Sequence, residues 1–346
     1  MPCCRECKNE FQAPVFRHNT NVAEKYWLKV DQVKVSIVAA VYNVAPYLPS
    51  FIDGVLEQTY HNWELLLVND GSTDESGRIC DDYLRIDSRI RVIHQPNEGV
   101  SSARNAGIKE ASGDWLLLPD ADDLLSRDAL EILLSYAKED VDLVCAAYTR
   151  YVQGELVPER VISETKKVSV SEYVDEIGCL TGARNIDRYC WNKLFRLSLI
   201  KSHNILFHEE FSNCEDILYV YQYLSRCTHK IQCVSYKMYI YFRRSTGAAM
   251  SLLKTYTPKS GGKFLAMTMC YDLLEQMEAS QVTKERMRRE ILDSYNIIVS
   301  LIDKSGCGYE DKKVFKKKLL QYYSGRELLM MDLKKLYHRV CSVFRK

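Results

Sequence analysis

Residues 35–147 alternate between two hydrophobic periods, and this alternation limits the chain to few folds. Apolar runs typical of strands buried on both faces lie at 35–41, 64–69, 91–94, 115–118 and 141–147. Between them, apolar residues recur at helical spacing. Strands and helices that alternate with short links predict a Rossmann-like, mainly parallel α/β sheet with helices on both faces.

Four helices are expected within this segment. The apolar stripe over residues 48–56 predicts the first. Ser72-Thr73-Asp74-Glu75 has the spacing of a capping box, which predicts that the second helix starts there and continues to about Arg85. Two more are expected at 101–110 and 126–139.

Polar residues follow three of the predicted strands. They are Tyr42-Asn43, Asn69-Asp70-Gly71 and Asp120-Ala121-Asp122-Asp123. Ligands of such sheets bind beyond the carboxyl ends of the strands, so we expect these residues to share one rim. Neither GxGxxG nor GxxxxGK[ST] occurs after the first strand, so a bound diphosphate needs another source of positive charge.

Asp120 and Asp122 supply a candidate metal site. In an extended backbone, residues two apart point the same way. Mg²⁺ and Mn²⁺ prefer oxygen ligands and typically use one or two carboxylates together with substrate phosphates. The alternative is a solvated acidic turn in which Asp122 or Asp123 and Ser126 cap the next helix. The position after a buried strand favours the metal site.

The segment Asn97–Gly107 links the third strand to its helix. Gly99 and Ser101 permit a tight turn, and free N–H groups at a helix start attract anions. Arg104 adds a positive charge near the same rim. The alternative is a capped helix that carries a surface arginine.

Four ordered segments, VSIVAAVYN, ELLLVNDGSTDES, NEGVSSARNAGI and GDWLLLPDADD, closely resemble the family 2 glycosyltransferases of the GT-A fold. The resemblance covers about residues 33–245. WNKLF at 191–195 and EDILY at 215–219 resemble the bacterial branch that builds capsular, exopolysaccharide or lipopolysaccharide glycans. The chain departs from the pattern at Ala40, where proline is common, and at Asn69, where an aspartate is usual.

The resemblance implies roles for individual residues on the donor side. Ala40, Tyr42 and Asn43 would lie along the nucleoside of a nucleotide-sugar donor. Asp70 would accept a hydrogen bond from the base, and Arg104 would lie near the base or the diphosphate.

The resemblance also implies a metal site and a catalytic base. Asp120 would reach the ribose or the metal, and Asp122 would bind the metal that bridges the diphosphate. Asp216 would be the base, in the first turn of a helix capped by Asn213, where the helix dipole favours an ionised carboxylate. The alternative is that Glu215 and Asp216 only stabilise the helix. One base opposite the leaving group implies inversion.

Other candidates have weaker support. His208-Glu209-Glu210 could complete a metal shell, although a surface loop is the alternative. Arg243 and Arg244 could contact the diphosphate. Aromatic residues that could stack on an acceptor sugar, with core packing as the alternative, are Trp191, Tyr219, Tyr221 and Tyr223.

The C-terminal hundred residues have a helical pattern and an unequal charge. Helices are expected at 262–281, 284–304, 310–323 and 326–344. The whole chain has a formal charge of +1, which argues against a general nucleic-acid binder. Residues 310–346, however, hold eleven Lys and Arg against four Asp and Glu. This basic amphipathic end is typical of an anionic membrane surface contact, or it packs on the catalytic domain or a second subunit.

The thirteen cysteines are scattered, which indicates buried free thiols in a reducing cytosol. Cys4 and Cys7 form half a zinc motif without a second pair, so an N-terminal extension is expected over residues 1–32. No apolar run is long enough to cross a bilayer, and no secretory signal is evident. These features predict a cytoplasmic protein, with peripheral attachment to the inner face of the plasma membrane as an option.

The resemblance implies a GT-A catalytic domain over 33–247, and the helical pattern predicts an appendage over 248–346. The expected activity is inverting, metal-dependent transfer from a nucleotide sugar, a UDP-sugar with Mn²⁺ or Mg²⁺, to a glycan or lipid-linked acceptor in cell-surface polysaccharide synthesis. One alternative is a sugar-1-phosphate nucleotidyltransferase, although the glycine-rich basic loop that it needs after the first strand is missing. The other is a non-catalytic sugar-binding or scaffold protein, which the intact aspartates disfavour.

Overall fold

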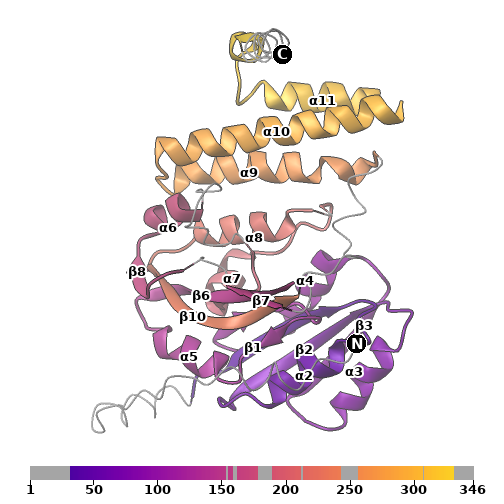
Figure 1. Ribbon diagram of the computed structural model, residues 1–346, viewed down its shortest axis with the longest axis vertical. Coiled ribbons are helices and arrows are strands. Elements are labelled where there is room, and N and C mark those ends of the chain that lie inside the picture. Colours follow the sequence, from indigo (N-terminus) through magenta and orange to yellow (C-terminus); the bar gives the residue numbers. More distant parts are fainter. Residues whose placement is uncertain are drawn as a thin grey trace.

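The structure is a computed structural model. It describes residues 32–152, 155–158, 162–177, 189–211, 213–242, 256–306 and 308–330. In Figure 1 a twisted sheet with its helices fills the lower half, and a stack of long helices lies above it. The helical stack belongs to the C-terminal third of the chain.

The first half of the sheet is parallel, as predicted. It comprises β1 (Val35–Val41), β2 (Trp63–Asp70), β3 (Ile90–Gln95) and β4 (Trp115–Leu117). Their order in space is β3-β2-β1-β4, so β1 is central and pairs with β2 from Val35↔Trp63 to Val41↔Asn69. The carboxyl ends of β1, β2 and β4 therefore meet at one edge.

The second half of the sheet is mixed, so the mainly parallel character that was expected holds for the first half alone. β9 (Lys193–Arg196) lies antiparallel between β4 and β6 (Val141–Val152), and β10 (Lys230–Phe242) runs parallel to β6. Short antiparallel strands complete the sheet: β5 (Leu124–Leu125), β7 (Glu155–Pro158) and β8 (Lys166–Val168). The α/β class itself is confirmed.

Helices cover both faces of the parallel half. α2 (Leu48–Leu56) and α3 (Ser76–Leu84) lie on one face, and α4 (Val100–Glu110) lies on the other, as right-handed crossovers in opposite directions require (Figure 1). α4 packs closely because Gly107 leaves room: a Cβ there would lie 2.3 Å from Val38 Cγ1. After β5 the chain forms α5 (Ala129–Tyr136).

The predicted start of α3 is wrong. The helix begins at Ser76 rather than at Ser72, and its N-terminus has no side-chain cap. Residues 72–75 instead form a turn in which Asp74 Oδ1 accepts a hydrogen bond from the Ser76 N–H (2.9 Å). The polar side chains of this turn bind the end of β1 instead of capping the helix.

Three shorter helices follow β8 and lead towards the C-terminal stack. They are α6 (Val170–Ile177), α7 (Leu197–His203) and α8 (Glu215–Leu224). α8 lies between the sheet and α9 in Figure 1. Its first turn is therefore held near the sheet edge while its other face contacts the stack.

The stack contains α9 (Gly262–Gln276), α10 (Gln281–Ser305) and α11 (Tyr309–Leu319), preceded by a 3₁₀ turn at Pro258–Gly261. These confirm three predicted helices, with ends shifted by a few residues. Residues 325–330 are also helical, and the rest of the fourth predicted helix lies outside the described residues. Within the described ranges, no helix has the length and apolar character needed to cross a bilayer.

One continuous apolar core joins the sheet to the helical stack. Buried residues from β1 and β2 belong to the same cluster as Leu218 of α8, Met267 of α9 and Ile291 of α10. The described cysteines are free, and those at 80, 145, 190, 233 and 270 are buried, as predicted. Cys4, Cys7, Arg243 and Arg244 lie outside the described residues.

Candidate active site

The ends of β1 and β2 are tied together at the rim. Asn43 has a left-handed backbone (φ 52°), and its Oδ1 accepts hydrogen bonds from the N–H groups of Thr73 (2.8 Å) and Asp74 (3.3 Å). Tyr42 is 47% exposed, next to this junction. The segment from Ala40 to Asn43 therefore has a fixed backbone and presents an exposed ring, as a nucleoside contact would require.

Asp70 is buried at the end of β2 and organises the neighbouring loop. Its Oδ1 accepts from Gln95 Nε2 (2.8 Å) and the Glu98 N–H (2.9 Å), and its Oδ2 accepts from the Gly99 N–H (2.9 Å). These bonds hold Gly99 at φ 96° directly before α4. Binding of a nucleotide base by Asp70 stays a prediction, and the carboxylate has this structural task as well.

Arg104 of α4 is buried, so the alternative of a surface arginine is wrong. Its Nη2 donates to Asp120 Oδ1 at 2.7 Å, and its Nη1 lies 3.8 Å from Glu215 Oε1. The guanidinium also lies over the ring of Phe207, 5.2 Å from the ring centre. Arg104 thus joins the loop after β4 to the start of α8.

Asp216 completes this group from the first turn of α8. Burial and the charge of Glu215 raise the pKa of Asp216 to about 7, although Arg104 opposes the shift. This corrects the expectation that the helix dipole keeps the carboxyl strongly ionised. The expected N-cap is also wrong, since Cys214 rather than Asn213 precedes the helix, with φ 66° and no side-chain cap.

Arg104, Asp120, Glu215 and Asp216 are referred to below as the charged cluster. They come from α4, from the loop after β4 and from α8, which are far apart in the sequence. A carboxyl with a pKa near neutrality can accept a proton at physiological pH, and perturbed groups of this kind concentrate at functional sites. The cluster is therefore the best candidate for the catalytic centre.

The loop after β4 depends on two residues, Asp123 and Tyr239, to which the sequence assigned no supporting role in this loop. Asp123 is 1% exposed and accepts hydrogen bonds from Tyr239 OH and the Phe242 N–H, both at 2.9 Å. Tyr239 OH in turn accepts from the Asp120 N–H at 3.0 Å. Burial and the charges of Asp120 and Asp122 raise the pKa of Asp123. Asp123 is thus a buried support of the loop rather than a helix cap.

Asp120 and Asp122 fit a metal site in which the substrate supplies the remaining ligands. Both are half-buried in the same loop. The described part of the chain contains no group of three His, Cys, Asp or Glu arranged to hold a metal. A site with one or two carboxylates is what Mg²⁺ or Mn²⁺ uses when phosphate oxygens complete the shell.

His208 and its neighbours are engaged with the protein. His208 contacts Glu210 through Nδ1 (2.8 Å) and Gln222 through Nε2 (3.0 Å). Glu209 accepts a hydrogen bond from Asn105 Nδ2 at 3.0 Å. Since both ring nitrogens of His208 are used, this segment supports the loop before α8 rather than adding a metal ligand.

The tyrosines of α8 are core residues. Tyr219, Tyr221 and Tyr223 are fully buried, and Trp191 is only 4% exposed. Tyr223 OH also accepts from the Arg196 N–H (2.9 Å), which ties α8 to β9. None of these four rings has a face open to a sugar, so core packing is the correct alternative.

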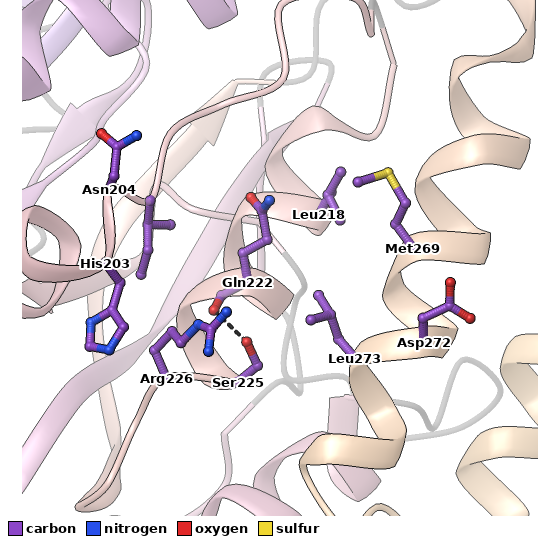
Figure 2. A pocket seen from close by; sticks show the side chains of 10 residues that line it. His203, Asn204, Leu218, Gln222, Ser225, Arg226, Met269, Asp272 and Leu273 are labelled. Atoms are coloured by element: carbon purple, nitrogen blue, oxygen red, sulfur yellow. Dashed lines mark hydrogen bonds between the residues drawn. The ribbon is translucent and has the colours of Figure 1, made fainter.

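A cavity of about 300 Å³ lies away from the charged cluster. It is bounded by α7, α8 and α9, and Figure 2 shows His203 and Asn204 on one side and Met269 and Asp272 of α9 on the other. Gln222 and Ser225, near the C-terminal end of α8, line it, whereas Asp216 is at the opposite end of that helix. The perturbed carboxyl and the paired Arg104 favour the carboxyl edge of the sheet as the reacting site.

Comparison with known proteins finds related glycosyltransferases. Residues 36–201 match the model of glycosyl transferase family 2. The chain is 37% identical over 190 residues to the uncharacterized glycosyltransferase EpsJ of Bacillus subtilis, covering 53% of each chain. It is 40% identical over 123 residues to the glycosyltransferase GlyG of Streptococcus pneumoniae, covering 35% of this chain and 41% of GlyG. The chain thus spans about half the length of the curated relatives that it matches.

Two solved structures share the fold. The chain is similar to S. aureus TarS 1–349 in complex with UDP-GlcNAc, with a TM-score of 0.62 and 20% identity, covering 84% of this chain and 80% of TarS. It is also similar to the mannosyltransferase PcManGT of Pyrobaculum calidifontis in complex with GDP-Man and Mn²⁺, with a TM-score of 0.52, 14% identity and 94% coverage of both chains. The expected fold is confirmed.

Proposed function

We propose that the protein transfers a glycosyl group from a nucleotide sugar to an acceptor hydroxyl, as the match of residues 36–201 to the model of glycosyl transferase family 2 indicates. The observation that carries the proposal is the charged cluster at the carboxyl edge of the sheet. There Asp216 has a pKa near 7 and Arg104 is paired with Asp120 at 2.7 Å. We assign the catalytic unit to residues 33–247 and the helical appendage to 248–346.

The donor site comprises the rim of β1 and β2 and the loop after β4. Ala40, Tyr42 and Asn43 border the nucleoside, and Asp70 lies behind them at the base. The neighbours that contain UDP-GlcNAc and GDP-Man support a nucleotide-sugar donor, and we propose a UDP-sugar. Asp122 and Asp120 would hold Mn²⁺ or Mg²⁺, which neutralises the negative charge that develops on the departing diphosphate.

Asp216 acts on the acceptor. An alcohol is too weakly acidic to attack at neutral pH unless a positioned base removes its proton. As the acceptor oxygen bonds to the anomeric carbon, its proton moves to the Asp216 carboxylate and the bond to the diphosphate breaks. Attack opposite the leaving group inverts the anomeric centre, so an α-linked donor gives a β-glycoside.

Arg104 holds the loop after β4 and the start of α8 in a fixed arrangement. Its charge lies between Asp120 on the donor side and Glu215 and Asp216 on the acceptor side. A buried guanidinium that pairs with a carboxylate restricts the position of both groups. We propose that Arg104 aligns the loop after β4 with the base instead of contacting the diphosphate directly.

The test is an assay of donor use. The full chain is incubated with UDP-glucose, UDP-galactose, UDP-GlcNAc and GDP-mannose, with Mn²⁺ or with a chelator, and nucleotide release is measured. We expect slow hydrolysis of one UDP-sugar that depends on the metal. Release of pyrophosphate from a sugar 1-phosphate and UTP would instead support the nucleotidyltransferase alternative. Binding of a nucleotide sugar without any turnover would support a non-catalytic sugar-binding protein.

The acceptor proposed is a glycan or lipid-linked sugar in cell-surface polysaccharide synthesis, used at the cytoplasmic face of the membrane. α11 supports a surface contact. Lys313, Lys316, Lys317 and Leu320 recur at helical spacing and are all exposed, and Val314 beside them is 64% exposed. Phe315 and Leu319 on the opposite face are buried. This outer face combines positive charge with apolar side chains, which suits an anionic bilayer surface.

Exchange of the three lysines on this face for glutamine is expected to weaken binding to phosphatidylserine vesicles. Each lysine near an anionic surface contributes about 1 kcal/mol, so the triple variant should bind about 100-fold more weakly. The matched control carries the same charge change at exposed sites elsewhere, Lys109, Lys167 and Lys230. Co-sedimentation at low and high salt gives the readout. Equal loss in both variants, or no loss in either, contradicts the contact.

A further inference from the structure

The segment before β9 runs beside the charged cluster and ends in an exposed ring. Cys190 is fully buried, and its thiol feels the charges of Arg104 and Asp216, although burial is the main reason that its pKa rises to about 12. The preceding residue, Tyr189, is 42% exposed. Tyr189 thus lies where the chain enters the buried surroundings of the charged cluster, and its ring reaches solvent.

The ring of Tyr189 rests on a firm base. It stacks on Trp191 with centroids 5.5 Å apart and planes at 13°. Trp191 stacks in turn on Tyr239 (4.6 Å, 21°) and meets Tyr148 edge-on at 4.7 Å. Lys193 Nζ donates to the carbonyl oxygen of Tyr189 at 2.6 Å, which fixes its backbone. A ring held in this way loses little conformational freedom when a ligand stacks on it.

We propose that Tyr189 is the platform on which the acceptor sugar stacks during transfer. The face of an aromatic ring is electron-rich, and the C–H groups on the less polar face of a pyranose pack against it with little desolvation cost. This inference rests on the proposed function, since it concerns the acceptor of that reaction. Tyr189 takes the role that the sequence suggested for Trp191 and the tyrosines of α8, because the rings of those residues are buried and the ring of Tyr189 is accessible.

The acceptor rather than the donor is indicated by what surrounds the ring. The rings beneath Tyr189 lead through Tyr239 to the loop of Asp120, and Asp120 pairs with Arg104 at 2.7 Å. Arg104 Nη1 lies 3.8 Å from Glu215, the neighbour of Asp216, which is the group that must reach the acceptor hydroxyl. The donor's nucleoside is assigned to the rim of β1 and β2, where Tyr42 provides its own exposed ring. Trp191 stacks on both Tyr189 and Tyr239, and Tyr239 OH accepts a hydrogen bond from the Asp120 N–H at 3.0 Å. The Tyr189 ring and the loop after β4 are therefore held by the same stack of rings.

The kinetics of variants distinguish an effect on acceptor binding from an effect on donor binding. With the donor identified above and methyl β-glycosides of glucose, galactose and N-acetylglucosamine as acceptors, Tyr189→Ala is expected to raise the acceptor KM by about three- to tenfold. The kcat at saturating acceptor should be retained, and Tyr189→Phe should behave as wild type because it keeps the ring. Tyr42→Ala should raise the donor KM instead. Tyr309→Ala, on the distant α11, is the control for loss of an exposed tyrosine.

An unchanged acceptor KM in Tyr189→Ala, or a donor KM that rises as much as the acceptor KM, overturns the platform. A second measurement needs no turnover: saturation-transfer NMR of the methyl glycosides on the full chain with UDP and Mn²⁺. The sugar ring signals of at least one glycoside should show transfer in the wild type and lose most of it in Tyr189→Ala. Absence of transfer in the wild type overturns the platform even where donor hydrolysis is found. Saturation transfer to a glycoside, in a protein that turns over none of the donors, would leave the sugar site in place and reject the proposed enzymatic activity.

Discussion

Asparagine in place of Asp216 will lower glycosyl transfer by about 10²- to 10⁴-fold, the usual contribution of a positioned general base. Asparagine keeps the size of the side chain but cannot accept the proton of the acceptor hydroxyl. Its Oδ1 can still accept the hydrogen bond that Asp216 receives from the Ile217 N–H (2.8 Å), so α8 should start as before. Nucleotide affinity, measured by calorimetry with UDP and Mn²⁺, should be retained.

The pH dependence of the wild type gives an independent check on the same carboxyl. Burial and Glu215 raise the pKa of Asp216 to about 7, so the base is protonated and inactive below that pH. kcat/KM, which reports on the free enzyme, should therefore rise with pH through about 7 and then level off. In the asparagine variant the residual rate should lack this rise.

Glu215→Gln is the matched control. Glu215 is half-buried next to Asp216, and its charge contributes to the raised pKa of Asp216. Removing that charge should move the rise in kcat/KM to lower pH while most of the activity is retained. Full activity in Asp216→Asn, or a pH profile that Glu215→Gln leaves in place, would show that another group removes the proton.

Local patterns were sufficient to predict the parallel half of the sheet. The run at 35–41 and the stripe at 48–56 both match the structure to the residue, as β1 and α2. In this half, consecutive strands are joined by single helices, so the sequence order and the right-handed crossover rule determine the arrangement. The rim residues Tyr42, Asn43, Asp70 and Asp120 could be located from this arrangement alone.

The mixed half could not be predicted from local patterns. β9 is four residues long, and it pairs with β4 and β6 because the chain returns to the sheet after a long excursion. Such pairings depend on tertiary contacts that no short window of sequence reveals. β10 shows the same limit, since two register shifts interrupt its pairing with β6 between Val234 and Tyr239.

The burial and the pKa values of the site residues could not be predicted from the sequence either. The spacing of Asp120 and Asp122 indicated a metal loop, but not that the next residue, Asp123, is buried against Tyr239. Helix position suggested an ionised Asp216, whereas burial and the charge of Glu215 raise its pKa against the opposing effects of Arg104 and the helix start. A pKa depends on groups from several segments, so it follows from the fold and not from the local pattern.

Removal of the Asp122 carboxylate should have the second large effect. We expect Asp122→Ala to lower metal-dependent transfer by about 10²-fold or more, because a metal that stabilises the leaving diphosphate contributes several kcal/mol. The affinity for Mn²⁺ in the presence of UDP, measured by the decrease in free Mn²⁺ signal in electron paramagnetic resonance, should fall in parallel. Asp82→Ala removes a surface carboxylate that pairs with Arg78 and should change neither quantity.

The adjacent Asp123 distinguishes metal binding from support of the loop. Asp122 is half-buried, so its replacement by alanine should leave the midpoint of thermal unfolding close to that of the wild type. Asp123→Ala instead leaves the buried Tyr239 OH and Phe242 N–H without their acceptor, which costs about 1–3 kcal/mol for each unsatisfied group. Its unfolding midpoint should therefore fall clearly. If Asp122→Ala lost stability to the same extent, or bound Mn²⁺ as tightly as the wild type, the carboxylate would be a structural element of the loop and not a metal ligand.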